Sequence, residues 1–183
     1  MTIKRQLATW IQRFFLLRWI LSLGVKLFAP KNQVGAIATI FNDAGQILLV
    51  EHVFRPYHTW GLPGGWVNRG ENPAHAIQRE IEEELNLKIE VKNLLFCEPQ
   101  GGHHQTIAPL SLGLAFYCRL NGEDSLHHIE QAPNAYEILS AKWVDPENIE
   151  WHLLPLEQKA IRLAKQRFAY DQNNLSSQNR DIL

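Results

Sequence analysis

The hydrophobic pattern divides the 183 residues into three parts. In residues 1–30, apolar side chains recur at steps of three and four, which places them on one stripe of a helix. The stripe consists of Leu7, Trp10, Phe14, Leu17, Leu21, Val25 and Phe28. From Val34 the pattern is that of β-strands, and the last residues are mostly polar. We therefore predict an amphipathic N-terminal helix over 1–30, a folded domain over 31–170 and a disordered polar tail over 171–183.

Strand and helix signals alternate along the central part. Asn72 followed by Pro73 indicates the start of a helix, because Asn is a preferred N-cap residue and Pro suits the first helical position. The expected elements are strands over 34–41 and 46–53, a glycine-rich turn over 60–65, a helix over 73–86, strands over 88–96, 107–120 and 140–144, and a closing helix over 155–170. This order predicts a mixed α/β domain around one sheet.

The N-terminal stripe is flanked by cations and contains no acidic residue, since no Asp or Glu precedes Asp43. Arg18 and Lys26 interrupt it, so its uncharged runs fall far short of the roughly 20 apolar residues that a membrane span requires. Two interpretations remain. The helix packs on its own domain or on a second copy of the chain, forming a homodimer, or it lies in an anionic membrane surface.

Composition narrows the class of protein further. With 45% hydrophobic and 20% charged residues and a net charge of −1, the chain is ordinary for a globular domain and gives no support for nucleic acid as its main partner. Cys97 and Cys118 lie in apolar, strand-like stretches without metal-ligand spacing. We expect both cysteines to be buried free thiols, which is typical of a cytoplasmic protein. If the N-terminal helix lies in a membrane surface, the protein would be peripheral to that membrane.

The helix expected from Pro73 carries an unusual charge pattern. At 100° per residue, an apolar arc of about 80° is formed by Ala74, Ile77, Ile81 and Leu85. Glu80, Glu83 and Glu84 occupy the adjoining arc, about 100° wide. Like charges at this spacing repel, and the C-terminal end of a helix disfavours anions. Oxygen ligands at this density suit a hard cation, Mg²⁺ first and Mn²⁺ next, whereas the alternative is a solvated acidic face.

The residues around this helix match a known pattern. Six of them follow the spacing G-x5-E-x7-R-E-I-x-E-E, namely Gly65, Glu71, Arg79, Glu80, Glu83 and Glu84. The pattern resembles the signature box of the Nudix hydrolases, with Asn86 where the family has glycine. Asn tolerates the left-handed conformation expected after a helix end, so we expect a modest stability cost and no loss of chemistry. The likeness covers about residues 34–170.

The resemblance implies a Nudix-type α/β/α sandwich and a set of residue roles. Glu80, Glu83 and Glu84 would bind the metal together with the carbonyl of Gly65. Arg79 would point away from the metal and pair with Glu71, which would tie the preceding loop to the helix; the alternative is a surface ion pair worth about 0–1 kcal/mol. The implied reaction is hydrolysis of a nucleoside diphosphate linked to another group, by attack of water on phosphorus.

The general base and the substrate contacts are less determined by the pattern. Glu80 is the first candidate for the base, and Glu137 is the second, with Glu123 and Glu130 behind it; each loop glutamate could equally be solvated surface. Candidate substrate contacts are Arg55, Trp60, His103 and His104, because arginine can bind phosphate and aromatic rings can stack on a base. Their alternative roles are packing at a pocket rim for the first two and ordinary loop exposure for the histidines.

The substrate class stays open at this stage. Flanking motifs typical of the ADP-ribose, diadenosine-polyphosphate, NADH and coenzyme A branches of the family are absent, which leaves nucleotide sugars, nucleoside triphosphates or a broad range of substrates. Two other classes of function compete with hydrolysis of these compounds. One is a non-catalytic Nudix-like nucleotide-binding module, and the other is a membrane-associated protein acting on a lipid-linked diphosphate.

Overall fold

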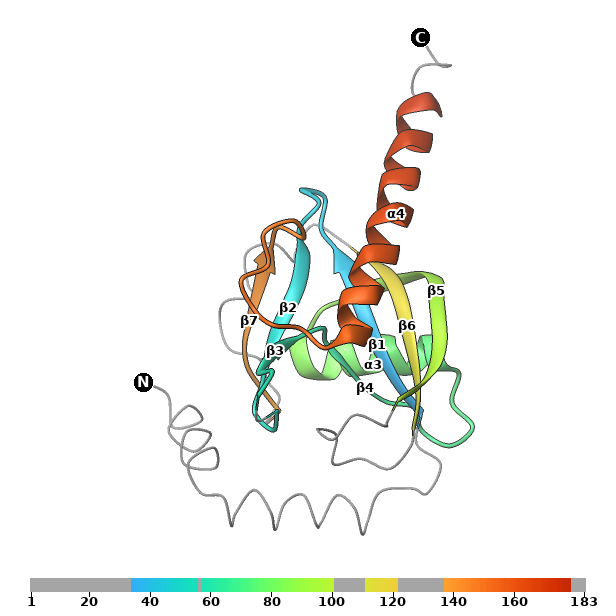
Figure 1. Ribbon diagram of the computed structural model, residues 1–183. Coiled ribbons are helices and arrows are strands. Elements are labelled where there is room, and N and C mark those ends of the chain that lie inside the picture. The colour runs from blue at the N-terminus through green and yellow to red at the C-terminus, as the bar shows by residue number, and fades with distance from the viewer. Residues whose placement is uncertain (1–33, 56, 101–110, 122–136, 179–183) are drawn as a thin grey trace, which may run out of the picture.

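Figure 1 shows the protein as a computed structural model, in which residues 34–55, 57–100, 111–121 and 137–178 are described. The N-terminal helix predicted over 1–30 lies outside these residues. Seven strands form a single mixed sheet: β1 Val34–Phe41, β2 Ile47–His52, β3 Trp60–Gly61, β4 Gly64–Trp66, β5 Ile89–Gln100, β6 Ser111–Leu120 and β7 Ile138–Val144. The described residues include two helices beside it, α3 Pro73–Leu85 and α4 Pro155–Gln178.

Strand β1 is the centre of the sheet. Along one edge it runs parallel to β6 over its full length, from Val34 opposite Leu112 to Phe41 opposite Arg119. Along its other edge it pairs antiparallel with β4 and then with β2. The outer pairs, β5 with β6 and β7 with β2, are antiparallel. The predicted hairpin of the first two strands is confirmed, and so is the mixed sheet.

Alternating side chains of the central strands enter two separate cores. On β1, Ala36, Ala38 and Ile40 face one core, whereas Ile37 and Phe41 face the other. Strands β2 and β6 divide their residues in the same way, because successive side chains of a strand point to opposite faces. A sheet with both faces covered produces the nearly continuous apolar runs seen in the sequence.

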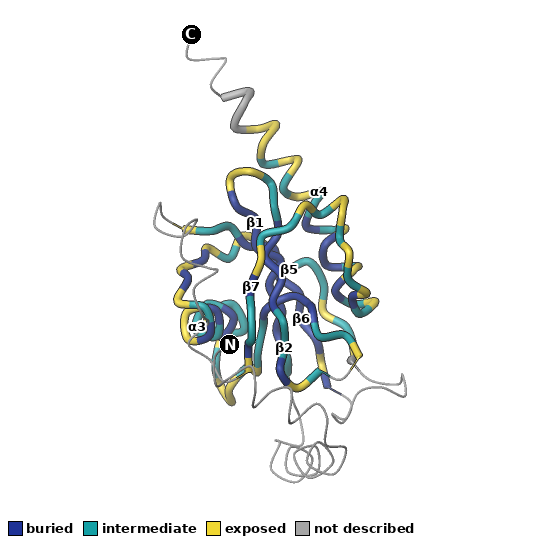
Figure 2. Tube along the Cα trace, turned by 90° about the vertical axis from the view of Figure 1, so that its left-hand side faces the viewer, coloured by how far each residue is buried: buried dark blue, intermediate teal, exposed yellow. Residues whose placement is uncertain are grey.

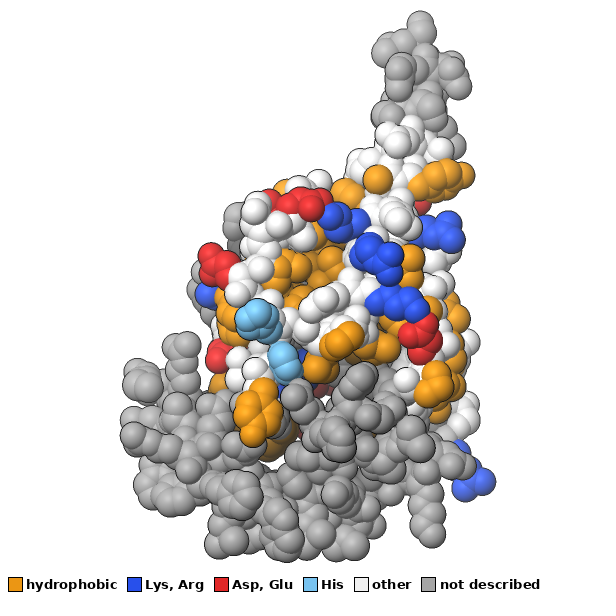
Figure 3. All heavy atoms as spheres, viewed as in Figure 1, with side chains coloured by type: hydrophobic (Ala, Val, Ile, Leu, Met, Phe, Trp, Pro, Cys, Tyr) orange, Lys and Arg blue, Asp and Glu red, His pale blue; other side chains and the backbone are white. Residues whose placement is uncertain are grey.

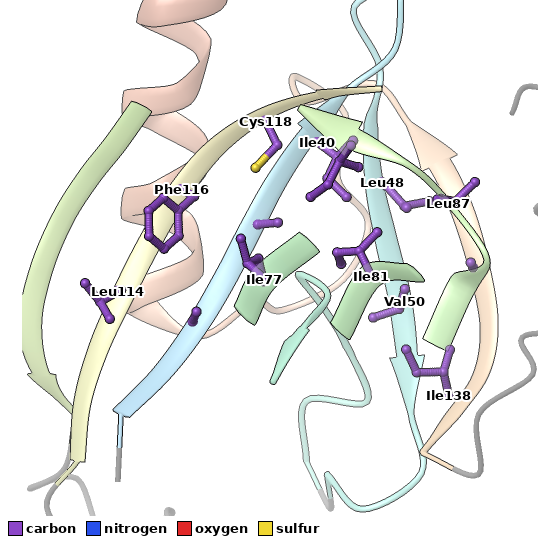
Figure 4. Close-up of a cluster of buried hydrophobic side chains, with 14 residues drawn as sticks. Ile40, Leu48, Val50, Ile77, Ile81, Leu87, Leu114, Phe116, Cys118 and Ile138 are labelled. Atoms are coloured by element: carbon purple, nitrogen blue, oxygen red, sulfur yellow. The ribbon is translucent and has the colours of Figure 1, made fainter. Parts of the chain in front are cut away.

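The two helices cover opposite faces of the sheet, which confirms the α/β/α sandwich (Figure 2). Ile77 and Ile81 of α3 are completely buried and point toward β1 and β2 (Figure 4). Ala160, Ile161 and Ala164 of α4 are buried in the second core. Each large aliphatic side chain buried in this way contributes roughly 1.5–3 kcal/mol.

Helix α3 begins and ends with the residues that the sequence indicated. The Asn72 side chain accepts a hydrogen bond from the Ala74 amide at 2.9 Å, and Pro73 occupies the first helical position. At the other end, Asn86 is left-handed with φ 55°, and its amide donates to the Glu82 carbonyl at 3.0 Å. Asn86 therefore adopts the conformation for which the related pattern uses glycine.

Helix α4 extends further than predicted. It continues through 171–178, so the prediction of a disordered tail from residue 171 is wrong for this stretch. No Gly or Pro interrupts it. The Tyr117 hydroxyl also donates to Asp171 Oδ2 at 2.9 Å, and Phe168 stacks on Phe41 with ring centroids 4.5 Å apart. These contacts hold the helix to the sheet just before the polar stretch begins.

Cations line the outer side of α4 (Figure 3). Lys159 pairs with Glu98 on β5, and Lys165 pairs with Glu147 in the loop after β7. Such exposed pairs contribute only about 0–1 kcal/mol each, so burial of the apolar side of α4 provides most of its attachment.

Two further predictions concern cysteines and membranes. Cys118 is buried as expected, and burial raises the pKa of its thiol, whereas Cys97 is exposed because it lies on β5, a strand at the edge of the sheet. The prediction of two buried thiols is therefore wrong for Cys97.

Among the described residues, neither helix is long and apolar enough to cross a bilayer.

Candidate active site

The structure brings the glycine-rich segment against the acidic helix. Strand β4 pairs with β1, with Gly65 opposite Ala36, and this pairing holds the segment beside α3. The carboxylate of Glu80 lies directly against the α-carbon of Gly65, where a Cβ atom would overlap Glu80 Cδ and Oε2. Gly64 is equally confined, since a Cβ there would overlap the backbone of β1. A side chain at Gly64 would therefore collide with backbone, and one at Gly65 would displace the Glu80 carboxylate.

Arg79 connects the helix with the loop before it. Its Nε and Nη2 donate to the two oxygens of Glu71, at 2.9 and 3.1 Å, and Nη2 also donates to the Trp66 carbonyl at 3.1 Å. The bidentate bond to Arg79 lowers the pKa of Glu71 to about 2. The predicted pairing of these two residues is confirmed.

Arg79 does not, however, point away from the acidic face. Its Nη1 donates to Glu80 Oε1 at 2.9 Å and to Glu83 Oε2 at 3.3 Å. The guanidinium reaches all three carboxylates because Glu80 is its chain neighbour, Glu83 is one turn further along, and Glu71 lies opposite. The prediction of an outward-facing Arg79 is therefore wrong, and the arginine partly neutralises the acidic face.

Glu84 is the most constrained carboxylate of the helix. It is buried, and among the described residues its Oε2 has no hydrogen-bond partner. Burial, followed by the charges of Glu80, Glu137 and Glu83, raises the pKa of Glu84 to about 8. Burial also raises the pKa of Glu80, against the hydrogen bond from Arg79. The four carboxylates thus concentrate negative charge at one place without enough cationic partners.

This donor set fits a hard divalent cation in its chemistry. The residues that would supply ligands are the glutamates and the Gly65 carbonyl, and within the described part of the chain Glu84 Oε2 is a buried acceptor without a donor. Within the described ranges, no three His, Cys, Asp or Glu side chains are already arranged as a complete ligand set. Glu80 and Glu83 instead share the Nη1 donor of Arg79. Glu83 has a largely exposed side chain that can change rotamer at little cost.

The other predicted site residues have different positions. Glu137 lies near the acidic helix, since its charge raises the pKa of both Glu80 and Glu84, and its carbonyl accepts from the Val53 amide at 2.8 Å. Arg55 is also close, because its charge lowers the pKa of Glu84. His103 and His104 lie outside the described residues, as do Glu123 and Glu130.

Trp60 occupies a position different from the predicted one. It is buried in the core beneath α4, and its ring stacks on Trp151 with centroids 4.6 Å apart, with Lys142 Nζ 5.4 Å from the Trp60 centroid. Because Trp60 is only 8% exposed, its ring is largely closed to a substrate base, and this burial argues against the predicted substrate contact. Exposed aromatic side chains nearby in the sequence are Phe54, Tyr57 and Trp66. Trp66 directly follows Gly65, so it is adjacent to the acidic site.

Glu157 is a buried residue that sequence reasoning missed. Its side chain is 2% exposed and lies 2.6 Å from Arg55 Nη1. The sequence contained one signal, an acidic residue two positions after Pro155 in the first turn of a helix. The partner Arg55 is 102 residues away, and local patterns give no information about such a pairing.

Fold and site together define a class of protein: an α/β/α sandwich in which a glycine-rich strand faces a helix carrying an arginine and three glutamates. The chain belongs to the Nudix family, since the model of the NUDIX domain matches residues 31–166. Nudix hydrolase 6 of Arabidopsis thaliana is 31% identical over 147 residues, covering 77% of this chain and 48% of that protein. Nucleoside diphosphate-linked moiety X motif 6 of Mus musculus is 28% identical over 139 residues, covering 72% and 41%.

Solved structures agree with this assignment. The crystal structure of a MutT NUDIX hydrolase from Burkholderia pseudomallei superimposes with a TM-score of 0.58 at 25% identity, covering 73% of this chain and 98% of that one. The chain spans less than half the length of the two relatives named above.

Proposed function

We propose that this protein is a magnesium-dependent pyrophosphohydrolase that cleaves the diphosphate linkage of a nucleoside diphosphate joined to another group. The observation that carries the proposal is the unbalanced acidic cluster of Glu80, Glu83 and Glu84. A buried carboxylate without a donor is costly, and the cluster combines it with like charges on adjacent turns. A divalent cation offsets both costs, and manganese would serve as an alternative to magnesium.

The residues that would hold the cation are Glu80, Glu83, Glu84 and the carbonyl of Gly65. When bound, the cation supplies positive charge that stabilises the phosphate oxygens in the transition state. The protein contributes the placement of these ligands. The bidentate bond between Arg79 and Glu71 fixes the loop that follows β4, and the confined glycines let the backbone approach the ligand site.

The general base would be Glu80, with Glu137 as the second candidate. Burial raises the pKa of Glu80 above its ordinary value, which makes its carboxylate a better proton acceptor than an exposed glutamate. Glu137 influences the same pKa, so it lies close enough to compete for this role. The pH profile of kcat distinguishes the two residues, because loss of a metal ligand lowers kcat at every pH whereas loss of the base removes the acidic limb of the profile. We expect that limb to disappear in Glu80→Gln and to remain in Glu137→Gln; the reverse would assign the role to Glu137.

Relatives and fold neighbours support the substrate class. The mouse relative is named for a nucleoside diphosphate-linked moiety, and the matched structure is named a NUDIX hydrolase. The substrate we propose is therefore a nucleoside diphosphate derivative, with nucleotide sugars and nucleoside triphosphates as the first compounds to test. Tyr57 and Trp66, with side chains 74% and 44% exposed, are available to stack on a base.

A panel of nucleotide sugars, dinucleotides and nucleoside triphosphates, incubated with Mg²⁺, with Mn²⁺ or with EDTA, tests the proposal. The products are separated by anion-exchange chromatography, because cleavage of a diphosphate linkage yields phosphomonoesters or pyrophosphate rather than inorganic phosphate. We expect turnover of at least one compound that depends on the divalent cation. Glu83→Gln is expected to abolish it, whereas the matched variant Glu82→Gln, on the exposed side of the same helix, should retain it. Metal-dependent nucleotide binding without turnover would instead identify a non-catalytic binding module.

A further inference from the structure

The carboxylate of Glu157 connects three segments that are far apart in the sequence. Its Oε2 accepts a hydrogen bond from the Leu154 amide at 2.9 Å, which caps the first turn of α4. Its Oε1 accepts from the Leu62 amide at 3.1 Å and from Arg55 Nη1 at 2.6 Å. The carboxylate thus joins the start of α4 to the segment that leads into Gly65.

Leu62 is held on both sides of its peptide backbone. Its amide donates to Glu157, and its carbonyl lies 3.3 Å from His52 Nε2. Burial, followed by the charge of Arg55, lowers the pKa of His52 to about 3, so the ring is neutral and donates from Nε2 in the matching tautomer. Gly61 passes directly beneath the ion pair, since a Cβ there would overlap Arg55 Nη1 and Glu157 Oε1.

The charge of Glu157 needs a reason beyond holding the backbone. Its two oxygens accept from two backbone amides, which a glutamine with one acceptor oxygen could not match, yet burying the charge is costly unless it is paired. The partner that compensates this charge is Arg55, whose side chain is 28% exposed. In the described part of the chain, Nη1 is the one guanidinium nitrogen of Arg55 with a hydrogen-bond partner. Among the described residues the other donors have no partner and are available to an anion. Arg55 packs against Gly61, in the segment that leads to Gly65, and lies within electrostatic reach of Glu84.

We propose that Glu157 is a positioning residue that holds the guanidinium of Arg55 toward the diphosphate of the substrate. This inference rests on the proposed function, because it assumes that a diphosphate occupies the site beside Glu84. Arg55 binds the phosphate oxygens, and Glu157 fixes its side chain in advance from the opposite side. An arginine held in this way loses less conformational freedom when the substrate binds. Its planar guanidinium can also donate two parallel hydrogen bonds to phosphate oxygens.

Binding of inorganic pyrophosphate, measured by titration calorimetry with excess Mg²⁺, tests the inference separately from turnover. We expect Arg55→Ala to weaken binding by about 10- to 100-fold, the loss typical of one or two hydrogen bonds to a charged group. Glu157→Gln should cause a loss of similar size. In the double variant, the loss should not exceed that of Arg55→Ala alone, because Glu157 acts through Arg55.

Two controls separate positioning from a general structural role. Glu147→Gln removes another carboxylate that contacts α4, through Lys165, and should leave pyrophosphate binding unchanged. Guanidinium ion added to Arg55→Ala should restore binding while Glu157 is present and fail to do so in the double variant. If Glu157→Gln does not fold, Glu157→Asp replaces it, with an intermediate loss expected because the charge is withdrawn by one methylene.

The inference is overturned if the losses of the two single variants multiply in the double variant, or if Glu157→Gln binds pyrophosphate as well as the unmodified chain does. Absence of pyrophosphate binding by the unmodified chain would overturn it as well. A chain that binds pyrophosphate through Arg55 and Glu157 but hydrolyses no compound of the panel would refute the proposed function and leave this inference intact.

Discussion

The carboxylate of Glu80 rests on the α-carbon of Gly65, and no side chain fits between them. This contact joins strand β4 to the acidic face of helix α3. The absence of a Cβ at Gly65 is therefore a requirement of the proposed chemistry rather than of the turn, because Gly65 does not have positive φ.

Gly65→Ala should abolish most of the activity while the protein stays folded. The new methyl group must push Glu80 away from its position, and displacements of about 1 Å in a catalytic group can lower kcat about 100-fold. Steady-state kinetics together with thermal unfolding measure the two effects.

Gly70→Ala is the matched control for this substitution. Gly70 has φ 80° and open space around its α-carbon. Alanine there should lower the free energy of unfolding by about 1–2 kcal/mol through backbone strain, with kcat retained. A fully active Gly65→Ala variant would show that the contact with Glu80 has no catalytic importance.

Glu83→Gln should separate catalysis from stability. Its side chain is 61% exposed, so the free energy of unfolding should change by no more than about 0.5 kcal/mol. Loss of one ligand charge should lower kcat by at least about 100-fold and weaken magnesium binding. Calorimetry with Mg²⁺ and unfolding curves provide the measurements. A variant that is less stable but equally fast would mean that the acidic face has been assigned incorrectly.

The raised pKa of Glu84 predicts how the stability of the metal-free protein depends on pH. Its pKa in the folded state is raised to about 8, from an ordinary value of 4.5. The folded state therefore holds this proton more tightly than the unfolded state, and the stability that the proton provides is lost as pH rises through about 8. In EDTA, Glu84→Gln should raise Tm relative to the unmodified chain at about pH 9, with the difference shrinking toward pH 5.

Thermal unfolding across this pH range tests the prediction, and added Mg²⁺ serves as the control. A bound cation stabilises the ionised form of Glu84, so it should remove or reverse the advantage of the glutamine variant. Equal Tm values in EDTA at both pH values would indicate that Glu84 is accessible to water and is ordinary surface.

Local patterns were sufficient to predict much of the fold. Asn72, Pro73 and Asn86 determine where helix α3 begins and ends through backbone interactions within a few residues, so their roles can be predicted from the sequence. The apolar runs of the central strands also follow from a local cause, since both faces of the sheet are covered. The spacing of the box similarly indicated that Glu80, Glu83 and Glu84 share one face of the helix.

Features that depend on distant packing were missed. Trp60 is buried because Trp151 stacks on it, and Glu157 is paired with Arg55, yet each partner lies some ninety or more residues away along the chain. Glu84 belongs to the acidic arc by its angle, but its burial depends on the elements packed around α3. The length of α4 was underestimated because polar composition does not exclude a helix whose preceding turns are packed on a sheet.

The bond between Glu71 and Arg79 predicts a loss of stability in acid. Arg79 lowers the pKa of Glu71 to about 2, from 4.5, so the folded state favours the ionised carboxylate. A depressed folded pKa gives stability that is fully present above about 4.5 and is lost as pH falls toward about 2. Glu71→Gln should therefore have a lower Tm than the unmodified chain at pH 7, and the two Tm values should converge as the pH falls through this window.

Glu90→Gln, which breaks the exposed pair with Lys92, is the matched control and should change Tm little at any pH. If the Tm difference of Glu71→Gln is instead constant down to pH 2, the charge of Glu71 is unimportant for stability. The stabilisation would then come from hydrogen bonds whose geometry the glutamine side chain cannot reproduce.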